Sequence, residues 1–222
     1  MKLTTIHYSL TTNLRFTGIS ASFEGQYLLY IIIKSFSLII FKLIFGLKIT
    51  GSESIPKTGP FVIVANHSSV FDGFIVVSSI RPKVTFMSAA YLFKMNFYGY
   101  ILRGVGAIPV QGKGSDIKFI KKAIKVLQTG GVLGIFPEGR IVNEKDGFSA
   151  KAGAAYFAVK AEVPIIPMAI KGADKALPVG AKLPKLNKIE VKIGKPISCS
   201  KKIKLNKKIL KDTVNSYMKE IY

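Results

Sequence analysis

The five-residue apolar run Phe61–Ala65 constrains the fold of this chain more than any other stretch. Its sequence, Phe-Val-Ile-Val-Ala, is apolar and mostly β-branched, which is typical of a strand buried on both faces. The run ends abruptly at the polar sequence Asn-His-Ser-Ser. Similar apolar runs alternate with helical patterns as far as residue 193. This alternation predicts an α/β domain with a mostly parallel central sheet flanked by helices.

Individual elements follow from the same patterns. Residues 189–193 alternate Ile-Glu-Val-Lys-Ile, which predicts a half-exposed edge strand. Residues 200–222 carry apolar side chains on one side and lysines opposite, which predicts a basic C-terminal helix. These segments place an α/β domain at residues 51–222. Its other expected strands are 61–65, 84–88, 107–110, 132–136 and 163–170, and its other expected helices are 71–79, 90–102, 116–128 and 151–161.

Residues 1–50 are predicted to be a separate N-terminal region. Residues 1–26 are rich in Thr and Ser and predict an irregular lead-in or a short helix, whereas 27–47 are almost entirely aliphatic and aromatic. Lys34 and Lys42 interrupt the apolar run, and a central Lys costs about 2.5–3.5 kcal/mol to insert across a bilayer. We therefore expect amphipathic helices that lie in the headgroup layer with their lysines turned outward. A buried core helix of a soluble protein is the alternative.

The charge of the chain points to an anionic partner. Lys and Arg number 33 against 12 Asp and Glu, which gives a net charge of +21, while 49% of residues are hydrophobic. This combination favours anionic membrane lipid or an anionic substrate. Nucleic acid is not expected as a partner, because Arg is scarce and no zinc-ligand cluster or aromatic recognition motif is present. The single cysteine and the lack of a secretory signal pattern indicate a reducing compartment.

The loop after the first buried strand carries a candidate catalytic pair. His67 is expected on the connecting turn, and Asp72 in the first turn of the next helix, where the helix dipole favours a carboxylate. A carboxylate that holds one ring nitrogen of a His leaves the other as a general base. The alternative is an ordinary turn followed by an ordinary helix start. The only other histidine, His7, lies in the lead-in, so we expect no metal site.

Two further loops are candidate binding segments. After the strand expected at 132–136, Glu138 and Arg140 flank Gly139, and Arg suits bidentate phosphate recognition. Glu138 is expected to orient Arg140 or to accept a substrate hydroxyl; a surface ion pair on a turn is the alternative. The glycine-rich loop at 104–114 carries Lys113 but has the spacing of neither a Walker loop nor a dinucleotide fingerprint.

Four segments together resemble the glycerolipid acyltransferase family. They are Asn66-His67-x4-Asp72, Gly-Ala-Ile-Pro-Val at 106–110, Phe-Pro-Glu-Gly at 136–139 and Val-Pro-Ile-Ile-Pro at 163–167. Their order and intervals match the family over about residues 51–197. The resemblance implies an O-acyltransferase that moves a fatty acyl group from acyl-CoA or acyl-carrier-protein to a glycerol hydroxyl. The typical acceptor is 1-acyl-glycerol-3-phosphate, a lysophospholipid, and the product is phosphatidic acid.

The resemblance also implies roles for individual residues. His67 would be the general base and Asp72 its orienting partner, while Glu138, Gly139 and Arg140 would belong to the site for the acceptor phosphate. Asn66 and Lys113 would also bind substrate, with Lys113 replacing an Arg that relatives carry after the second block. No bound cofactor is implied, because the thioester is a co-substrate. The segment 27–47 is similar to the N-terminal membrane motif of bacterial members, which predicts a peripheral or monotopic enzyme at the cytoplasmic face of the cell membrane.

Two alternatives remain at the level of sequence. The first is an acyltransferase for another acceptor, such as glycerol-3-phosphate or another lysophospholipid. The second is a catalytically silent lipid-binding relative that keeps the fold.

Overall fold

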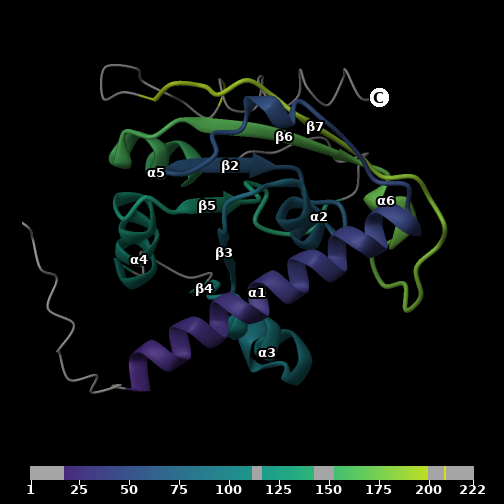
Figure 1. Ribbon diagram of the computed structural model, residues 1–222, viewed down its shortest axis with the longest axis horizontal. Coiled ribbons are helices and arrows are strands. Elements are labelled where there is room, and N and C mark those ends of the chain that lie inside the picture. The colour runs from purple at the N-terminus through teal and green to yellow at the C-terminus, as the bar shows by residue number, and fades with distance from the viewer. Residues whose placement is uncertain (1–17, 112–116, 143–152, 200–207, 209–222) are drawn as a thin grey trace, which may run out of the picture.

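A mostly parallel sheet forms the centre of the computed structural model, which describes residues 18–111, 117–142, 153–199 and 208 (Figure 1). Within these residues the sheet has seven strands in the order β1-β7-β6-β2-β5-β3-β4. The strands are β1 (Lys48–Thr50), β2 (Phe61–Ala65), β3 (Val84–Ala89), β4 (Ile108–Val110), β5 (Val132–Ile135), β6 (Ile165–Lys171) and β7 (Glu190–Ile193). Strands β6, β2, β5, β3 and β4 run parallel, whereas β7 runs antiparallel to β6. The predicted α/β fold is therefore confirmed.

Helices cover both faces of the sheet. They are α1 (Gly18–Leu43), α2 (Asp72–Ser79), α3 (Asn96–Gly104), α4 (Ile117–Gln128), α5 (Gly153–Ala161) and α6 (Ala173–Ala176), with short 3-10 helices η1 (Ser52–Ser54) and η2 (Ala90–Lys94). Phe61 and Ile63 face a core shared with α1, α2 and α6, while Val62 and Val64 face a core shared with α4 and α5. All five side chains of β2 are buried, as expected of a strand covered on both sides.

The strand predicted at 189–193 is present, but its predicted position at the edge of the sheet was wrong. β7 keeps the alternating burial that its sequence indicated, but it lies between β6 and β1. β1 pairs in parallel with β7, with Lys48 opposite Glu190 and Thr50 opposite Lys192. β1 was not predicted, because three residues are too few to show a strand period.

The predicted helix at 90–102 is broken into two. η2 ends at Lys94, and Met95 is extended, with φ −78° and ψ 134°, before α3 begins. α3 then packs closely on the preceding turn: a Cβ atom at Gly99 would lie 2.4 Å from the Phe93 carbonyl oxygen. Only glycine permits this approach.

The described part of the N-terminal region, where amphipathic helices were expected, forms one helix, α1, followed by the short strand β1. α1 runs diagonally across the molecule beside α2 and α3 (Figure 1). Its segment Gly25–Leu43 is long and apolar enough to cross a membrane, and only 17% of it is buried. Tyr30 and Phe41 face inward, and the Tyr30 hydroxyl accepts a hydrogen bond from the Val84 amide at 2.9 Å. The outward face carries Leu28, Ile32, Phe36, Ile39 and Leu43, which are 54–81% exposed.

The expectation that Lys34 turns outward was wrong. Its Nζ donates hydrogen bonds to the carbonyl oxygens of Ile80, directly after α2, and of Arg81, the latter at 2.7 Å. Lys34 therefore lies on the inward stripe of α1, where helix C-terminal carbonyls attract a cation. Lys42 is exposed, as expected. The basic helix predicted at 200–222 lies outside the described residues, except for Lys208.

Candidate active site

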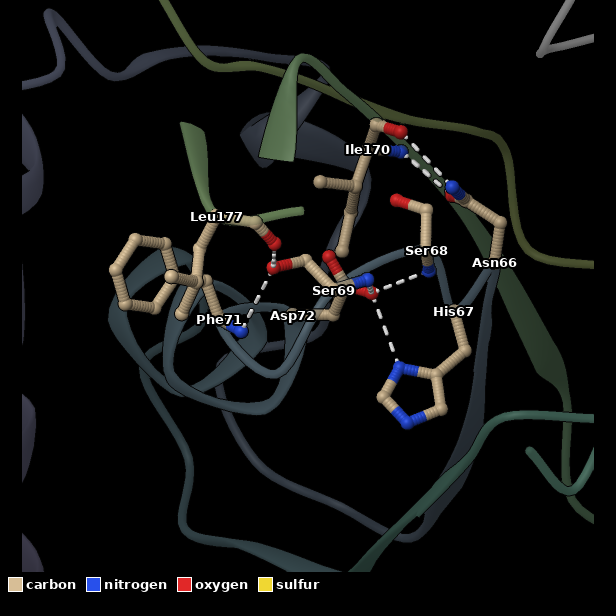
Figure 2. Close-up of polar contacts among 8 residues, drawn as sticks. All are labelled: Asn66, His67, Ser68, Ser69, Phe71, Asp72, Ile170 and Leu177. Atoms are coloured by element: carbon tan, nitrogen blue, oxygen red, sulfur yellow. Dashed lines mark hydrogen bonds and ion pairs between the residues drawn. The ribbon is translucent and has the colours of Figure 1, made fainter. Parts of the chain in front are cut away.

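The site lies where β2 ends and α2 begins. The chain leaves β2 at Ala65 and turns through four polar residues before Asp72 starts α2. His67 Nδ1 lies 3.0 Å from Asp72 Oδ2, and Figure 2 shows the other ring nitrogen, Nε2, pointing away from the carboxylate. The His67 side chain is 20% exposed, whereas Asp72 is fully buried. The geometry expected of an oriented general base is present.

Asp72 Oδ2 is held by the turn as well as by the imidazole. The backbone amides of Ser68 and Ser69 donate to it at 2.6 and 2.8 Å (Figure 2). Burial raises the pKa of the Asp72 carboxyl, while the hydrogen bonds from His67 and the two amides oppose this shift. Three donors directed at one oxygen stabilise the carboxylate form. The carboxylate in turn fixes the imidazole with its proton on Nδ1 and leaves Nε2 able to accept a proton.

Asn66 holds the loop against β6. Its side-chain amide donates to the Ile170 carbonyl at 2.9 Å, and its Oδ1 accepts from the Ile170 amide at 2.7 Å (Figure 2). The side chain therefore pairs with β6 as another strand residue would, and it is buried. This gives Asn66 a positioning role that the sequence did not indicate; direct contact with substrate stays a prediction.

The loop after β5 lies directly beside His67. The ring of Phe136 stacks on the imidazole, with centroids 4.1 Å apart and planes 14° apart. The ring of Phe86 in β3 also stacks on Phe136, with centroids 5.5 Å apart and planes 11° apart. The Val142 amide donates to the His67 carbonyl at 2.8 Å, which joins a later residue of this loop to His67 as well. Phe136 was part of the recognised motif, but its stacking on His67 was not predicted.

Within this loop, Glu138, Gly139 and Arg140 are placed differently from one another. Gly139 has φ +70°, a conformation that favours glycine, and closes a turn onto the Phe136 carbonyl at 3.0 Å. Arg140 is exposed. Glu138 is buried, and neither carboxylate oxygen has a hydrogen-bond partner among the described residues. The expected orientation of Arg140 by Glu138 is therefore not formed. Burial raises the pKa of Glu138 to about 7.

One of the expected site residues is not described by the structure, and a metal site was not expected from the sequence. Lys113 lies outside the described residues, so its binding role stays a prediction. In the part of the chain that the structure covers, no group of three or more His, Cys, Asp or Glu side chains could hold a metal ion.

A fixed imidazole with one free nitrogen, at the carboxyl edge of a mostly parallel sheet, is chemically able to take a proton from a hydroxyl. The comparisons identify the class: the Acyltransferase family model matches residues 46–171, more than half of the chain. The chain therefore belongs to the acyltransferase family and is an acyltransferase.

Several individual acyltransferases are similar to this chain. The chain is 31% identical to the 1-acyl-sn-glycerol-3-phosphate acyltransferase of Bacillus subtilis, over 68% of this chain and 74% of that protein. It is 29% identical to the chloroplastic enzyme LPAT1 of Arabidopsis thaliana, over 71% of this chain but only 45% of that protein. The fold matches the crystal structure of the 1-acyl-sn-glycerophosphate acyltransferase PlsC from Thermotoga maritima, with a TM-score of 0.76 and 24% identity over 91% and 86% of the two chains.

Proposed function

We propose that this enzyme transfers a fatty acyl group from a thioester to the free hydroxyl of 1-acyl-glycerol-3-phosphate and so produces phosphatidic acid. The observation that carries the proposal is the contact between His67 Nδ1 and Asp72 Oδ2 at 3.0 Å, with Nε2 pointing away from the carboxylate. The acceptor is supported by the names of the most similar relatives, which include proteins of bacteria and chloroplasts.

The proposed reaction is a direct transfer with His67 as general base. Nε2 takes the proton of the acceptor hydroxyl while the hydroxyl oxygen attacks the thioester carbonyl. The tetrahedral intermediate collapses, its carbon–sulfur bond breaks, and Nε2–H returns the proton to the departing thiolate. Asp72 stabilises the imidazolium that forms between these steps, and its own position is fixed by the amides of Ser68 and Ser69. No acyl-enzyme intermediate is needed.

The acceptor phosphate is proposed to bind at the loop after β5. Arg140 is exposed there and presents a guanidinium that can bind phosphate in a bidentate manner. Val142, two residues further on, is joined to the His67 backbone by its amide at 2.8 Å. A phosphate held at Arg140 would thus lie on the loop that also contacts the base, and this bond would fix the distance between them.

The co-substrate and the membrane complete the proposal. The acyl donor is either acyl-CoA or acyl-carrier-protein, both of which are anionic partners for a chain of charge +21. The outward face of α1 carries exposed apolar side chains from Leu28 to Leu43, interrupted by the exposed Ser35 and Lys42, which supports association with the anionic cytoplasmic face of the cell membrane. Because Lys34 is satisfied by carbonyl groups within the protein, it does not place a charge on that face.

Acyl transfer by purified variants tests the mechanism. We expect His67→Ala to lower kcat by about a hundredfold or more, since the proton acceptor is lost. Asp72→Asn should also lower kcat strongly, because the imidazole loses the partner that fixes its proton on Nδ1. The assay follows labelled acyl-CoA in detergent micelles, with thermal unfolding measured to show that both variants fold. His7→Ala, which alters the only other histidine, is the control and should keep full activity. Normal turnover by His67→Ala would refute the mechanism.

A panel of acceptors tests the substrate independently of the base. It contains 1-acyl-glycerol-3-phosphate, glycerol-3-phosphate and a lysophospholipid without a terminal phosphate. We expect preferential esterification of the first. Arg140 is proposed to bind its terminal phosphate, and the apolar face of α1 is proposed to place the enzyme at the membrane where a lipid acceptor lies. Preference for glycerol-3-phosphate or for the lysophospholipid without a terminal phosphate would overturn the acceptor assignment while leaving the acyl-transfer chemistry in place.

A further inference from the structure

The loop between α6 and β7 exposes large apolar side chains. In this segment, residues 177–188 (the 177–188 loop), Val179 is 65% exposed, Leu183 78% and Leu186 82%. Leu183 and Leu186 are among the most exposed large apolar side chains in the described chain, and neither is needed for the core of the sheet. Apolar side chains that project this far are costly in water, and their clustering in one loop indicates a partner.

The loop is held in a defined shape at both ends. At its start, the Ser69 hydroxyl donates to the Leu177 carbonyl at 2.9 Å, and the Pro178 carbonyl accepts from the Ala181 amide at 3.0 Å. At its end, the Asn187 side chain donates to the Gly172 carbonyl at 2.9 Å. Between them, the Lys185 amide donates to the Ala176 carbonyl at 2.7 Å. The exposed leucines are thus carried on a backbone that is fastened to the body of the protein.

The charges of the 177–188 loop specify the kind of partner. Lys182, Lys185 and Lys188 alternate with the apolar residues, all three are exposed, and no acidic residue lies between Asp174 and Glu190. A protein interface core excludes lysine, whereas leucines that enter a bilayer beside lysines that stay at the phosphates are typical of interfacial membrane contact. Each Lys close to an anionic surface adds to the electrostatic attraction.

The loop also lies beside the end of the apolar helix. Its last residue is followed by Ile189, whose amide donates to the Phe45 carbonyl at 3.0 Å and whose carbonyl accepts from the Lys48 amide at 3.0 Å. Figure 1 shows the loop emerging from α6 next to the C-terminal end of α1. The exposed apolar face of α1 extends to Leu43, which is 81% exposed, at this same end of the helix.

We propose that the 177–188 loop is a second membrane contact, in which Val179, Leu183 and Leu186 enter the acyl boundary of an anionic bilayer and the lysines bind its phosphates. The inference rests on the proposed association of α1 with the same membrane. Because the Ser69 hydroxyl binds Leu177, and Ser69 also donates its amide to Asp72, insertion of the loop would set the bilayer surface beside the catalytic turn.

Site-specific fluorescence tests the proposal in the full chain. The single buried cysteine is removed by Cys199→Ala, and an environment-sensitive dye is attached at one of three positions: Leu183→Cys in the loop, Ile39→Cys on α1, or Lys121→Cys on α4 as control. The proteins are mixed with vesicles of equal phosphatidylcholine and phosphatidylglycerol that contain lipids with a quencher near the acyl carbonyl. We expect a blue shift and quenching at positions 183 and 39 and neither at position 121.

The three positions separate the inference from the proposed function. Insertion at position 39 without insertion at 183 would overturn the loop proposal and leave the α1 proposal intact. Insertion at 183 without 39 would support the loop and contradict the role of α1, and insertion at neither would overturn both. A blue shift at 183 that grows with protein concentration in the absence of vesicles would assign the loop to self-association instead.

Charge variants supply a second measurement. Lys182→Gln combined with Lys185→Gln should weaken binding to the anionic vesicles several-fold, because two lysines at the surface are lost. Lys121→Gln combined with Lys122→Gln removes the same charge from α4, where both lysines are exposed, and should have a smaller effect. Equal effects of the two pairs would show that only net charge matters and would count against the loop.

Discussion

The arrangement around Asp72 shows how a buried carboxylate is used in this site. One oxygen, Oδ2, receives the imidazole and two backbone amides, whereas Oδ1 has no hydrogen-bond partner among the described residues. The amides come from the turn directly before α2, and the Ser69 carbonyl in turn accepts from the Asp72 amide at 3.2 Å, so this turn holds both the carboxylate and the start of the helix. A substitution at Asp72 is therefore expected to alter the imidazole and the start of α2 together.

Glu138 gives a prediction for stability against pH. Burial raises the pKa of its carboxyl from 4.5 to about 7, so the fold favours the neutral acid. Its contribution to the free energy of unfolding is fully present below pH 4.5 and is lost as the pH rises through about 7. Glu138→Gln stays neutral throughout, so we expect it to match the wild type at low pH and to exceed it above pH 7 by about 1–3 kcal/mol.

Urea unfolding from low to neutral pH measures this difference. Glu190→Gln is the control, because Glu190 is exposed on β7 and its change should leave the pH profile as it was. If Glu138→Gln and the wild type lost stability in parallel as the pH rose, the buried carboxyl would not be the group responsible.

At the scale of residues, sequence identifies local partners better than distant ones. The His67–Asp72 contact was predictable because it spans one turn and a helix start, and the positive φ of Gly139 follows from the residue type. The hydrogen bond between Asn66 and Ile170 joins residues 104 positions apart in the sequence. Neither segment alone indicates that the two strand ends lie side by side. The surroundings of Glu138 were likewise unpredictable, since the fold brings this buried carboxyl close to His67 and Asp72.

At the scale of elements, α1 and α2 act as a joined pair. Lys34 reaches from α1 to the carbonyls of Ile80 and Arg81, and Phe41 and Phe45 pack edge-on against Phe71, which precedes Asp72. The apolar N-terminal helix is thus in contact with both ends of the helix that begins at the catalytic carboxylate.

Lys34→Met tests this joint. Methionine keeps the length of the side chain but donates no hydrogen bond, so two carbonyls lose their partner. We expect a loss of about 1–3 kcal/mol in the free energy of unfolding, measured by denaturant titration in mild detergent. Lys42→Met on the exposed side of the same helix should change it by less than about 0.5 kcal/mol. If both variants behaved alike, the hydrogen bonds of Lys34 would contribute nothing to stability.

The elements themselves were mostly predictable where they are long. The strands at β2, β5 and β6 and the helix α4 follow from apolar runs and from helical periodicity. The errors fall where tertiary contact decides. β1 is only three residues long and exists because β7 lies beside it, and the helix expected from Ala90 breaks at Met95, where α3 turns back onto Phe93. The direction of Lys34 was mistaken because its acceptors are backbone groups 46 and 47 residues away.

At the scale of the whole molecule, charge and apolar surface should contribute separately to membrane binding. The net charge of +21 attracts an anionic surface through a field that salt screens, whereas burial of apolar side chains depends little on salt. We expect binding to phosphatidylglycerol vesicles to weaken when NaCl rises from about 0.05 M to about 0.5 M but not to vanish. Flotation of vesicles through a density gradient measures the bound fraction.

Vesicles of pure phosphatidylcholine provide the control. They should bind less protein at low salt, and the bound fraction should change little as salt rises. Without anionic lipid, only the burial of apolar side chains contributes to binding. Equal binding to both kinds of vesicle at low salt would contradict a role for the positive charge.

The short connection between α1 and β1 has a consequence for how substrates meet. Only residues 44–47 separate the helix from β1, the edge strand of the sheet, which is hydrogen-bonded to β7. A helix that lies in lipid and is joined to the sheet by so short a segment would restrict rotation of the domain relative to the membrane. The catalytic turn would therefore stay at a fixed distance from the bilayer surface. The lipid acceptor would then reach the active site by lateral diffusion within the membrane, in two dimensions.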